Sequence, residues 1–172
     1  MPKVLIIDTS ILCAWLGVPG KETCGAAHDR WDQTRVKQKI EEEQQQKTTF
    51  VLPLATIIET GNHIAQATSQ RYELAQALAG LMELAAVQQT PWAAFTDQSV
   101  LWEAEGLKKL AQEWPTLAAQ GISIGDATIK TVAEHYVRLG FHVEILTGDA
   151  GLKSYEPAPP PVLKRSRRRN RS

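Results

Sequence analysis

The sequence has few cysteines and no long hydrophobic run, and each shortage removes a class of protein from consideration. Cys13 and Cys24 are its two cysteines and form no CxxC or Cys/His pattern, so we expect neither a disulfide scaffold nor a zinc site. No run of about 18 apolar residues is present and no basic-plus-apolar leader opens the chain, which is typical of a protein neither exported nor inserted in a membrane. We therefore expect a cytoplasmic protein with two buried thiols and no membrane partner.

The chain also lacks net charge, with 19 basic and 19 acidic residues, but the balance hides an asymmetry. Six basic residues lie in "KRSRRRNR", residues 164–171, so the preceding chain holds 13 basic against 19 acidic residues, a net charge of −6. The stretch "EPAPPPV" before them favours extended polyproline geometry. We expect one globular domain over residues 1–155, followed over residues 156–172 by a proline-rich spacer and a basic tail without fixed structure.

The basic tail has a bland and a functional interpretation. A terminal charge run is more often a solvated end than a specific site. Even so, six cations on a short segment would add a salt-sensitive attraction to a nucleic-acid backbone, which the net negative charge of the domain would otherwise repel. The hypothesis is that the tail tethers RNA through Lys164, Arg165, Arg167, Arg168, Arg169 and Arg171.

Short apolar segments alternate with helical ones along the domain. "KVLIID" (3–8), "TFVLPL" (49–54) and "HVEILT" (142–147) predict strands buried on both faces, and "AAVQQT" (85–90) is a weaker candidate strand. Helices are predicted over 30–47, 72–86, 99–114 and 127–140, the last closed by Gly140. This alternation predicts an α/β fold, a three-layer sandwich around a mainly parallel central sheet.

Four acidic residues fall where such a sheet collects ligands, at the carboxyl ends of its strands. Asp8 ends the first strand, Glu59 opens the helix after "FVLPL", Asp126 opens the helix of "GDATIK", and Asp149 follows "HVEILTG". Each acid also has a purely structural interpretation. "TIIE" (56–59) and "SIGD" (123–126) match a capping box, Asp8 could cap a short helix, and Asp149 suits a turn.

The conjunction of four acids favours a metal site over four separate caps. Carboxylates crowded at one sheet edge repel by several kcal/mol per close pair at an effective dielectric of about 20, and a divalent cation removes that cost. Oxygen ligands favour hard cations such as Mg²⁺ or Mn²⁺. One such ion, or two about 4 Å apart, could activate water for attack on a phosphodiester and stabilise the leaving oxygen.

The same residues carry a resemblance to a known family. "LIIDTSILCAWL", "LATIIETGNHI", "SIGDATIKTVA" and "ILTGDAGL" resemble, in order and approximate spacing, the four motifs of the PIN-domain ribonucleases, and most closely the small VapC-type toxins of toxin–antitoxin systems. The resemblance implies a PIN-like domain in which Asp8, Glu59, Asp126 and Asp149 bind Mg²⁺ or Mn²⁺ and support cleavage of RNA. It also implies that Ser10 and Thr147 support the acids, and that a cognate antitoxin and a homodimer are the partners to look for.

Two other functions stay open at this point. A haloacid-dehalogenase-like phosphohydrolase also places an aspartate after its first strand, but its mechanism needs a second aspartate two positions on, where this chain has Ser10. A catalytically silent PIN-like module that binds RNA or a protein partner would keep the same acids. His63, one helical turn after Glu59, is more readily a packing or surface residue than a ligand of a hard metal. Lys130 could face a phosphate or pair with an acid, and the five tryptophans are expected to pack in the core or between helices.

Overall fold

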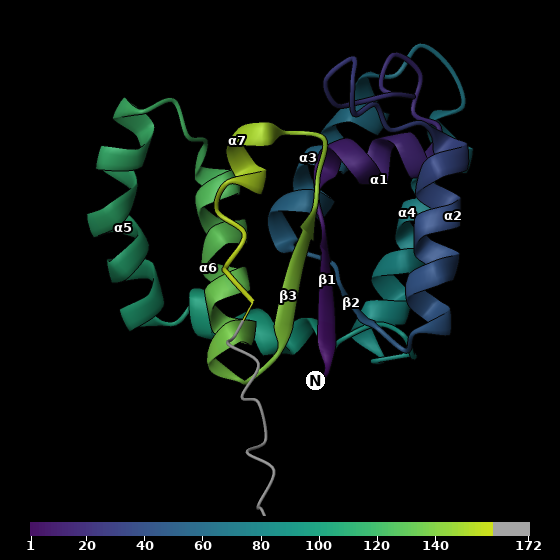
Figure 1. Ribbon diagram of the computed structural model, residues 1–172. Helices are drawn as coiled ribbons and strands as arrows, with labels where there is room; N and C mark the ends of the chain where they lie inside the picture. Colours follow the sequence, from purple (N-terminus) through teal and green to yellow (C-terminus); the bar gives the residue numbers. More distant parts are fainter. Residues whose placement is uncertain (160–172) are drawn as a thin grey trace, which may run out of the picture.

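The computed structural model describes residues 1–159, and its centre is a parallel sheet of three strands (Figure 1). The strands are β1 (Lys3–Ile7), β2 (Thr49–Val51) and β3 (His142–Leu146), in the order β2-β1-β3. Both pairings are parallel, with Leu5 opposite Phe50 on one side and opposite Glu144 on the other. The predictions of an α/β fold, of a parallel sheet and of these three strands are confirmed.

Helices fill the connections between the strands, and one short helix follows the last strand. They are α1 (Thr9–Leu16), α2 (Gln33–Gln45), α3 (Leu54–Gln66), α4 (Arg71–Ala86), the 3₁₀ helix η1 (Phe95–Leu101), α5 (Ala104–Ala119), α6 (Ile124–Arg138) and α7 (Ala150–Lys153). In the described residues 1–159 no helix is both long and apolar enough to cross a membrane. The basic tail, residues 164–171, lies outside the described part of the chain.

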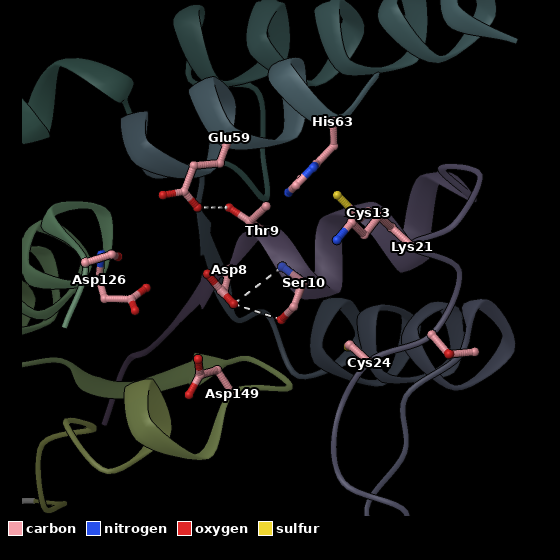
Figure 2. Close-up of a pocket in the computed structure, with 12 residues that line it drawn as sticks. Asp8, Thr9, Ser10, Cys13, Lys21, Cys24, Glu59, His63, Asp126 and Asp149 are labelled. Carbon is pink, nitrogen blue, oxygen red and sulfur yellow. Dashed lines mark hydrogen bonds between the residues drawn. The ribbon is translucent and has the colours of Figure 1, made fainter. Parts of the chain in front are cut away.

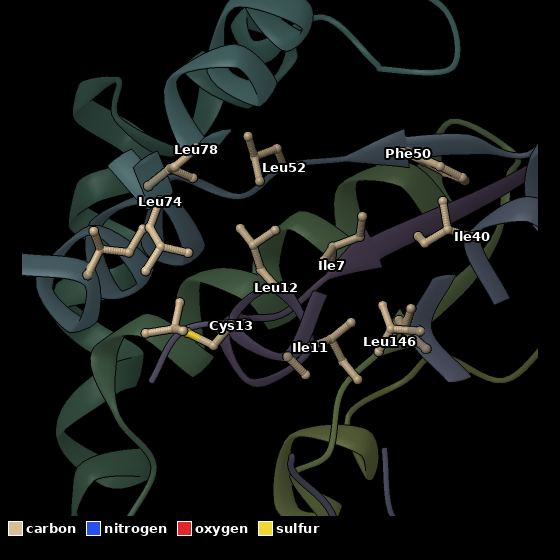
Figure 3. Packing of buried hydrophobic residues seen from close by; sticks show 14 of the residues in the cluster. Ile7, Ile11, Leu12, Cys13, Ile40, Phe50, Leu52, Leu74, Leu78 and Leu146 are labelled. Atoms are coloured by element: carbon tan, nitrogen blue, oxygen red, sulfur yellow. The ribbon is translucent and has the colours of Figure 1, made fainter. Parts of the chain in front are cut away.

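The strands alternate their side chains between two hydrophobic clusters, one on each face of the sheet. Leu5 and Ile7 belong to a cluster with residues of α1, α2, α3 and α4 (Figure 3), whereas Val4 and Ile6 pack with α6 and η1. All four strand residues are fully buried. This double burial explains why the strands are continuous apolar runs rather than alternating ones.

Three predictions about elements are wrong in detail. Residues 85–90 do not form a strand, because α4 continues to Ala86 and only Trp92, further on, makes a single bridge to Phe50. The helix predicted over 99–114 is divided into η1 and α5, with Trp102 between them. Glu59 does not open its helix: α3 begins at Leu54, and Glu59 lies in its second turn.

Tryptophan packing follows the prediction only in part. Trp92 is 5% exposed and stacks on Trp15 with ring centroids 6.4 Å apart, and it meets Phe50 edge to face. Trp102 is 42% exposed.

Gly140, predicted to close α6, does so with a φ of 89°, a left-handed conformation that glycine adopts without strain.

Candidate active site

Asp8 lies at the C-terminal end of the central strand, between β1 and α1. Its side chain caps α1, is 5% exposed, and accepts hydrogen bonds through Oδ2 from the hydroxyls of Ser10 (2.8 Å) and Thr147 (2.7 Å). Ser10 follows β1 and Thr147 follows β3, so hydrogen bonds from the C-terminal ends of two adjacent strands hold the Asp8 carboxylate in place. A buried carboxylate held by hydroxyl donors is oriented as well as solvated.

Asp149 is positioned by the same small network. Its backbone N–H donates to Thr147 Oγ1 (2.9 Å), and its Oδ1 accepts from the backbone of Gly151 and Leu152 at the start of α7. Ser10 Oγ also accepts from Gly148 N (3.0 Å). Hydrogen bonds of Ser10 and Thr147 therefore link Asp8 with the turn that carries Asp149.

Glu59 reaches the same region from α3. Its Oε2 accepts a hydrogen bond from Thr9 Oγ1 (2.9 Å), and its Oε1 lies over Gly125, where an added Cβ would clash with it. Glycine at 125 thus leaves room for the carboxylate beside the first turn of α6. The capping box predicted for "TIIE" is wrong, since Pro53 precedes α3 and Thr56 instead donates to Ile7 O (2.9 Å).

Asp126 completes the group in the first turn of α6. Ser123 is the N-cap of that helix and its Oγ accepts from Asp126 N (3.0 Å), so the capping interpretation of "SIGD" is confirmed for the serine. The Asp126 carboxylate itself is left to face the other acids.

All four acids line one cavity of about 470 Å³ (Figure 2). The remaining lining comes from α1, from the loop after it, from α3 and from the N-cap of α6. These residues are Thr9, Ser10, Cys13, Lys21, Thr23, Cys24, His63 and Ser123. The carboxyl edge of the sheet therefore brings together acids that are separated by up to 141 positions in the chain, from residue 8 to residue 149.

The electrostatics of the cavity act most strongly on Asp126. Burial, followed by repulsion from Asp8 and Asp149, raises the pKa of Asp126 from 3.8 to about 6; the hydrogen bond with Ser123 opposes this rise, and Glu59 adds to it. A carboxyl group that burial and then neighbouring carboxylates force toward its protonated form marks a site of uncompensated negative charge.

The donor set fits a hard divalent cation in its chemistry, since carboxylate and hydroxyl oxygens surround the cavity. As the side chains stand, no group of three or more His, Cys, Asp or Glu residues within residues 1–159 is arranged so that it could hold a metal ion. Rotation of the carboxylates about their side-chain bonds would be needed to close such a group. Side-chain torsions adjust to a ligand more readily than helix positions do, and the helices and strands already bring the four acids to one cavity.

Cys13, Cys24 and Lys130 are not suited to bind a metal ion or to act on a substrate in this cavity. Burial raises the pKa of Cys13 to about 11 and also raises that of Cys24, so both remain protonated thiols near neutral pH, unsuited to act as nucleophiles or metal ligands. Cys24 is half-buried, not buried as predicted. Lys130 pairs with Glu134 at 2.9 Å and does not line the cavity.

Lys21, Thr9 and His63 are among the cavity residues that the sequence interpretation did not place there. Thr9 stands inside the "DTS" motif, so a hydroxyl next to Asp8 was visible in the sequence. Lys21 lies in the loop between α1 and α2, where no periodicity or motif indicates which way a side chain points.

Comparison with known proteins adds no relative: no family model, curated protein or solved structure matches this chain significantly.

Proposed function

We propose that this protein is a metal-dependent endoribonuclease of the PIN type that hydrolyses phosphodiester bonds in RNA. The observation that carries the proposal is the convergence of Asp8, Glu59, Asp126 and Asp149 on one cavity at the carboxyl edge of a parallel sheet. Helices packed against both faces of that sheet support the three-layer sandwich that belongs to this family. The biological role that we propose is that of a cytoplasmic toxin in a toxin–antitoxin or defence system.

The residues divide into acids that would hold the ion and hydroxyls that position the acids. Asp8, Glu59, Asp126 and Asp149 would hold Mg²⁺ or Mn²⁺, which when bound supplies an activated water for in-line attack and charge stabilisation of the leaving oxygen. Ser10 and Thr147 keep Asp8 directed into the cavity, and Thr9 does the same for Glu59. No side chain is required to form a covalent intermediate.

The phosphohydrolase alternative is weakened by Ser10. In that mechanism the residue two positions after the nucleophile is an acid that moves a proton, whereas Ser10 donates its hydroxyl to Asp8 and accepts from Gly148. Failure to trap a phosphoaspartate separates the two enzymes. The silent binding module differs from our proposal only in lacking cleavage, so a cleavage assay decides between them.

The deciding experiment is cleavage of labelled single-stranded and structured RNA with Mg²⁺, Mn²⁺ or EDTA. We expect metal-dependent cleavage by the unmodified protein, and a loss of roughly 100-fold or more in Asp8→Asn and Asp149→Asn, because each removes a carboxylate ligand. Asparagine caps a helix about as well as aspartate, so both variants should stay folded.

Asp32→Asn is the matched control, since Asp32 caps α2 and its side chain accepts from Arg35 N (2.8 Å) outside the cavity. Activity that survives in Asp8→Asn, or an equal loss in Asp32→Asn, would contradict the proposal. Equal traces of RNA in all lanes with folded protein would favour the silent module. The chain shortened by residues 162–172 should bind RNA less tightly at low salt if the tail is a tether.

A further inference from the structure

The cavity has a second wall whose chemistry is opposite to that of the acids. Asp8, Asp126 and Asp149 lie at the sheet edge and at α6, whereas Lys21 comes from the loop between α1 and α2 (Figure 2). Among the described residues that line the cavity, Lys21 is the only lysine or arginine. A single ammonium group therefore faces a cluster of carboxylates across an open space.

The loop that carries Lys21 is built as a fixed rim. Cys24 and Trp31 exchange two backbone hydrogen bonds, Cys24 N to Trp31 O (3.0 Å) and Trp31 N to Cys24 O (2.8 Å). The guanidinium of Arg35 lies 3.8 Å from the centre of the Trp31 ring and pairs with Asp29 at 2.8 Å. These contacts close residues 24–31 into a hairpin-like turn without regular strands.

The rim is also packed against the turn that carries Asp149. A Cβ at Gly148 would lie 2.7 Å from Cys24 Sγ and 2.8 Å from Gly25 N. Only glycine permits so close an approach of the two segments. The position of the Lys21 loop relative to the acids is thus set by direct backbone packing, and not by the lysine itself.

Lys21 is not used to hold the fold together. Its side chain is exposed, and none of the ion pairs in residues 1–159 includes it. Its charge nevertheless acts on the cavity, because it is one of the contacts that oppose the burial-driven rise in the pKa of Cys13. Lys21 Nζ is directed past Cys13 toward the acids (Figure 2).

We propose that Lys21 binds a non-bridging oxygen of the RNA phosphate in this cavity, from the side opposite the four acids. A phosphate drawn to the acidic wall still presents oxygens toward the loop, and an ammonium group is a suitable point-charge partner for them. The surrounding negative charge makes such a cation more valuable, since the chain before residue 164 has a net charge of −6 and repels nucleic acid. Because a phosphate contact carries no sequence information, Lys21 would strengthen binding to all RNA sequences alike.

This inference rests on the proposed function, and the experiment separates the two. Binding of short fluorescent single-stranded RNAs of two different sequences is measured by anisotropy over a salt series, with Ca²⁺ in place of Mg²⁺ and intact RNA verified on a gel. Lys21→Met should weaken binding to both sequences equally and reduce the slope of log K against log salt by about one. Lys21→Arg, which keeps the charge, should retain the slope.

Lys37→Met is the matched control, because Lys37 is an exposed lysine of α2 that does not line the cavity. It should leave the slope unchanged, and all three variants should melt like the unmodified protein. In the Mg²⁺ assay we expect kcat/KM to fall about 10- to 100-fold in Lys21→Met, as for loss of one charged hydrogen bond.

The outcomes assign failure to one idea or the other. If the unmodified protein cleaves RNA and Lys21→Met shows the same salt slope and kcat/KM, the phosphate contact is refuted while the nuclease stands. If the unmodified protein does not cleave but the slope still depends on Lys21, the nuclease is refuted and the contact remains. If the slope of log K against log salt falls equally in Lys37→Met, RNA binding depends only on the overall charge of the protein, and the inference is overturned.

Discussion

Replacing Asp126 by asparagine should stabilise the metal-free protein while abolishing its proposed activity. The structure places Asp126 among carboxylates that raise its pKa from 3.8 to about 6. A folded-state pKa above the unfolded value means that the folded protein holds this proton more tightly. The ionised carboxylate therefore costs stability above pH 6, and the cost is relieved as pH falls from about 7 toward 4.

The size of the effect follows from the shift and from two corrections. A shift of this size corresponds to about 3 kcal/mol at most. Asp126 is only half-buried, so solvent screening reduces that value to about 1–2 kcal/mol. Asparagine also loses the favourable interaction of a carboxylate with the first turn of α6, which is worth about 0.3–1 kcal/mol. We expect Asp126→Asn to raise the free energy of unfolding by about 1 kcal/mol at pH 7.5.

Urea denaturation in EDTA at several pH values measures this difference. Glu73→Gln is the matched control, because Glu73 is exposed in the first turn of α4 and does not line the cavity. The control should be neutral or slightly destabilising at every pH, whereas the gain in Asp126→Asn should shrink as the pH falls from 7.5 to 4. Added Mg²⁺ should stabilise the unmodified protein and not the variant.

Two results would refute this reasoning. If the Asp126→Asn variant has a lower free energy of unfolding than the unmodified protein in EDTA at pH 7.5, the four acids do not repel one another in the folded chain. A gain that is independent of pH would mean that the aspartate costs stability for a reason other than its charge.

Two further predictions concern groups on either side of the sheet. Burial raises the pKa of Glu43, but hydrogen bonds from Lys3, Lys39 and Thr48 outweigh it and lower the pKa to about 2. Glu43→Gln should therefore cost about 2–3 kcal/mol at pH 7, a loss that shrinks as the pH falls from 4.5 to 2; a loss of the same size at pH 2 in urea denaturation would contradict it. Gly125→Ala should displace the Glu59 carboxylate from α6 and reduce RNA cleavage about tenfold or more, with little change in melting temperature. The control is Gly80→Ala, which should cleave RNA normally because an added Cβ at Gly80 meets no other atom within 4 Å.

The strands and the start of α6 could be predicted because local chemistry decides them. Runs such as residues 3–7 are apolar at every position, and only a strand buried on both faces accommodates that. Asp8 follows such a run directly and Asp149 comes three residues after β3, so their place at the carboxyl edge required no tertiary information. Ser123, a good N-cap residue, likewise marks the start of α6.

Where local signals were weak or ambiguous, the tertiary structure decided otherwise. Thr56 has the sequence of a cap, but its hydroxyl is taken by Ile7 O across the core, and α3 starts two residues earlier. Lys130 and Lys21 are indistinguishable as charged residues in a sequence. Packing directs the first to Glu134 and the second into the cavity.

The sequence by itself determined which residues end the strands of a parallel sheet, because apolar periodicity and capping act over a few residues. The sequence also predicted that Glu59 and Asp126 would gather with Asp8 and Asp149 at one sheet edge. Only the tertiary structure decided that the four line a single cavity, since that depends on how α3 and α6 pack beside β1. It also decided that Lys21 faces them, because the Gly148 contact with Cys24 sets the place of the loop. Such contacts join residues far apart in the chain, as Gly148 and Cys24 are, and no local pattern encodes them.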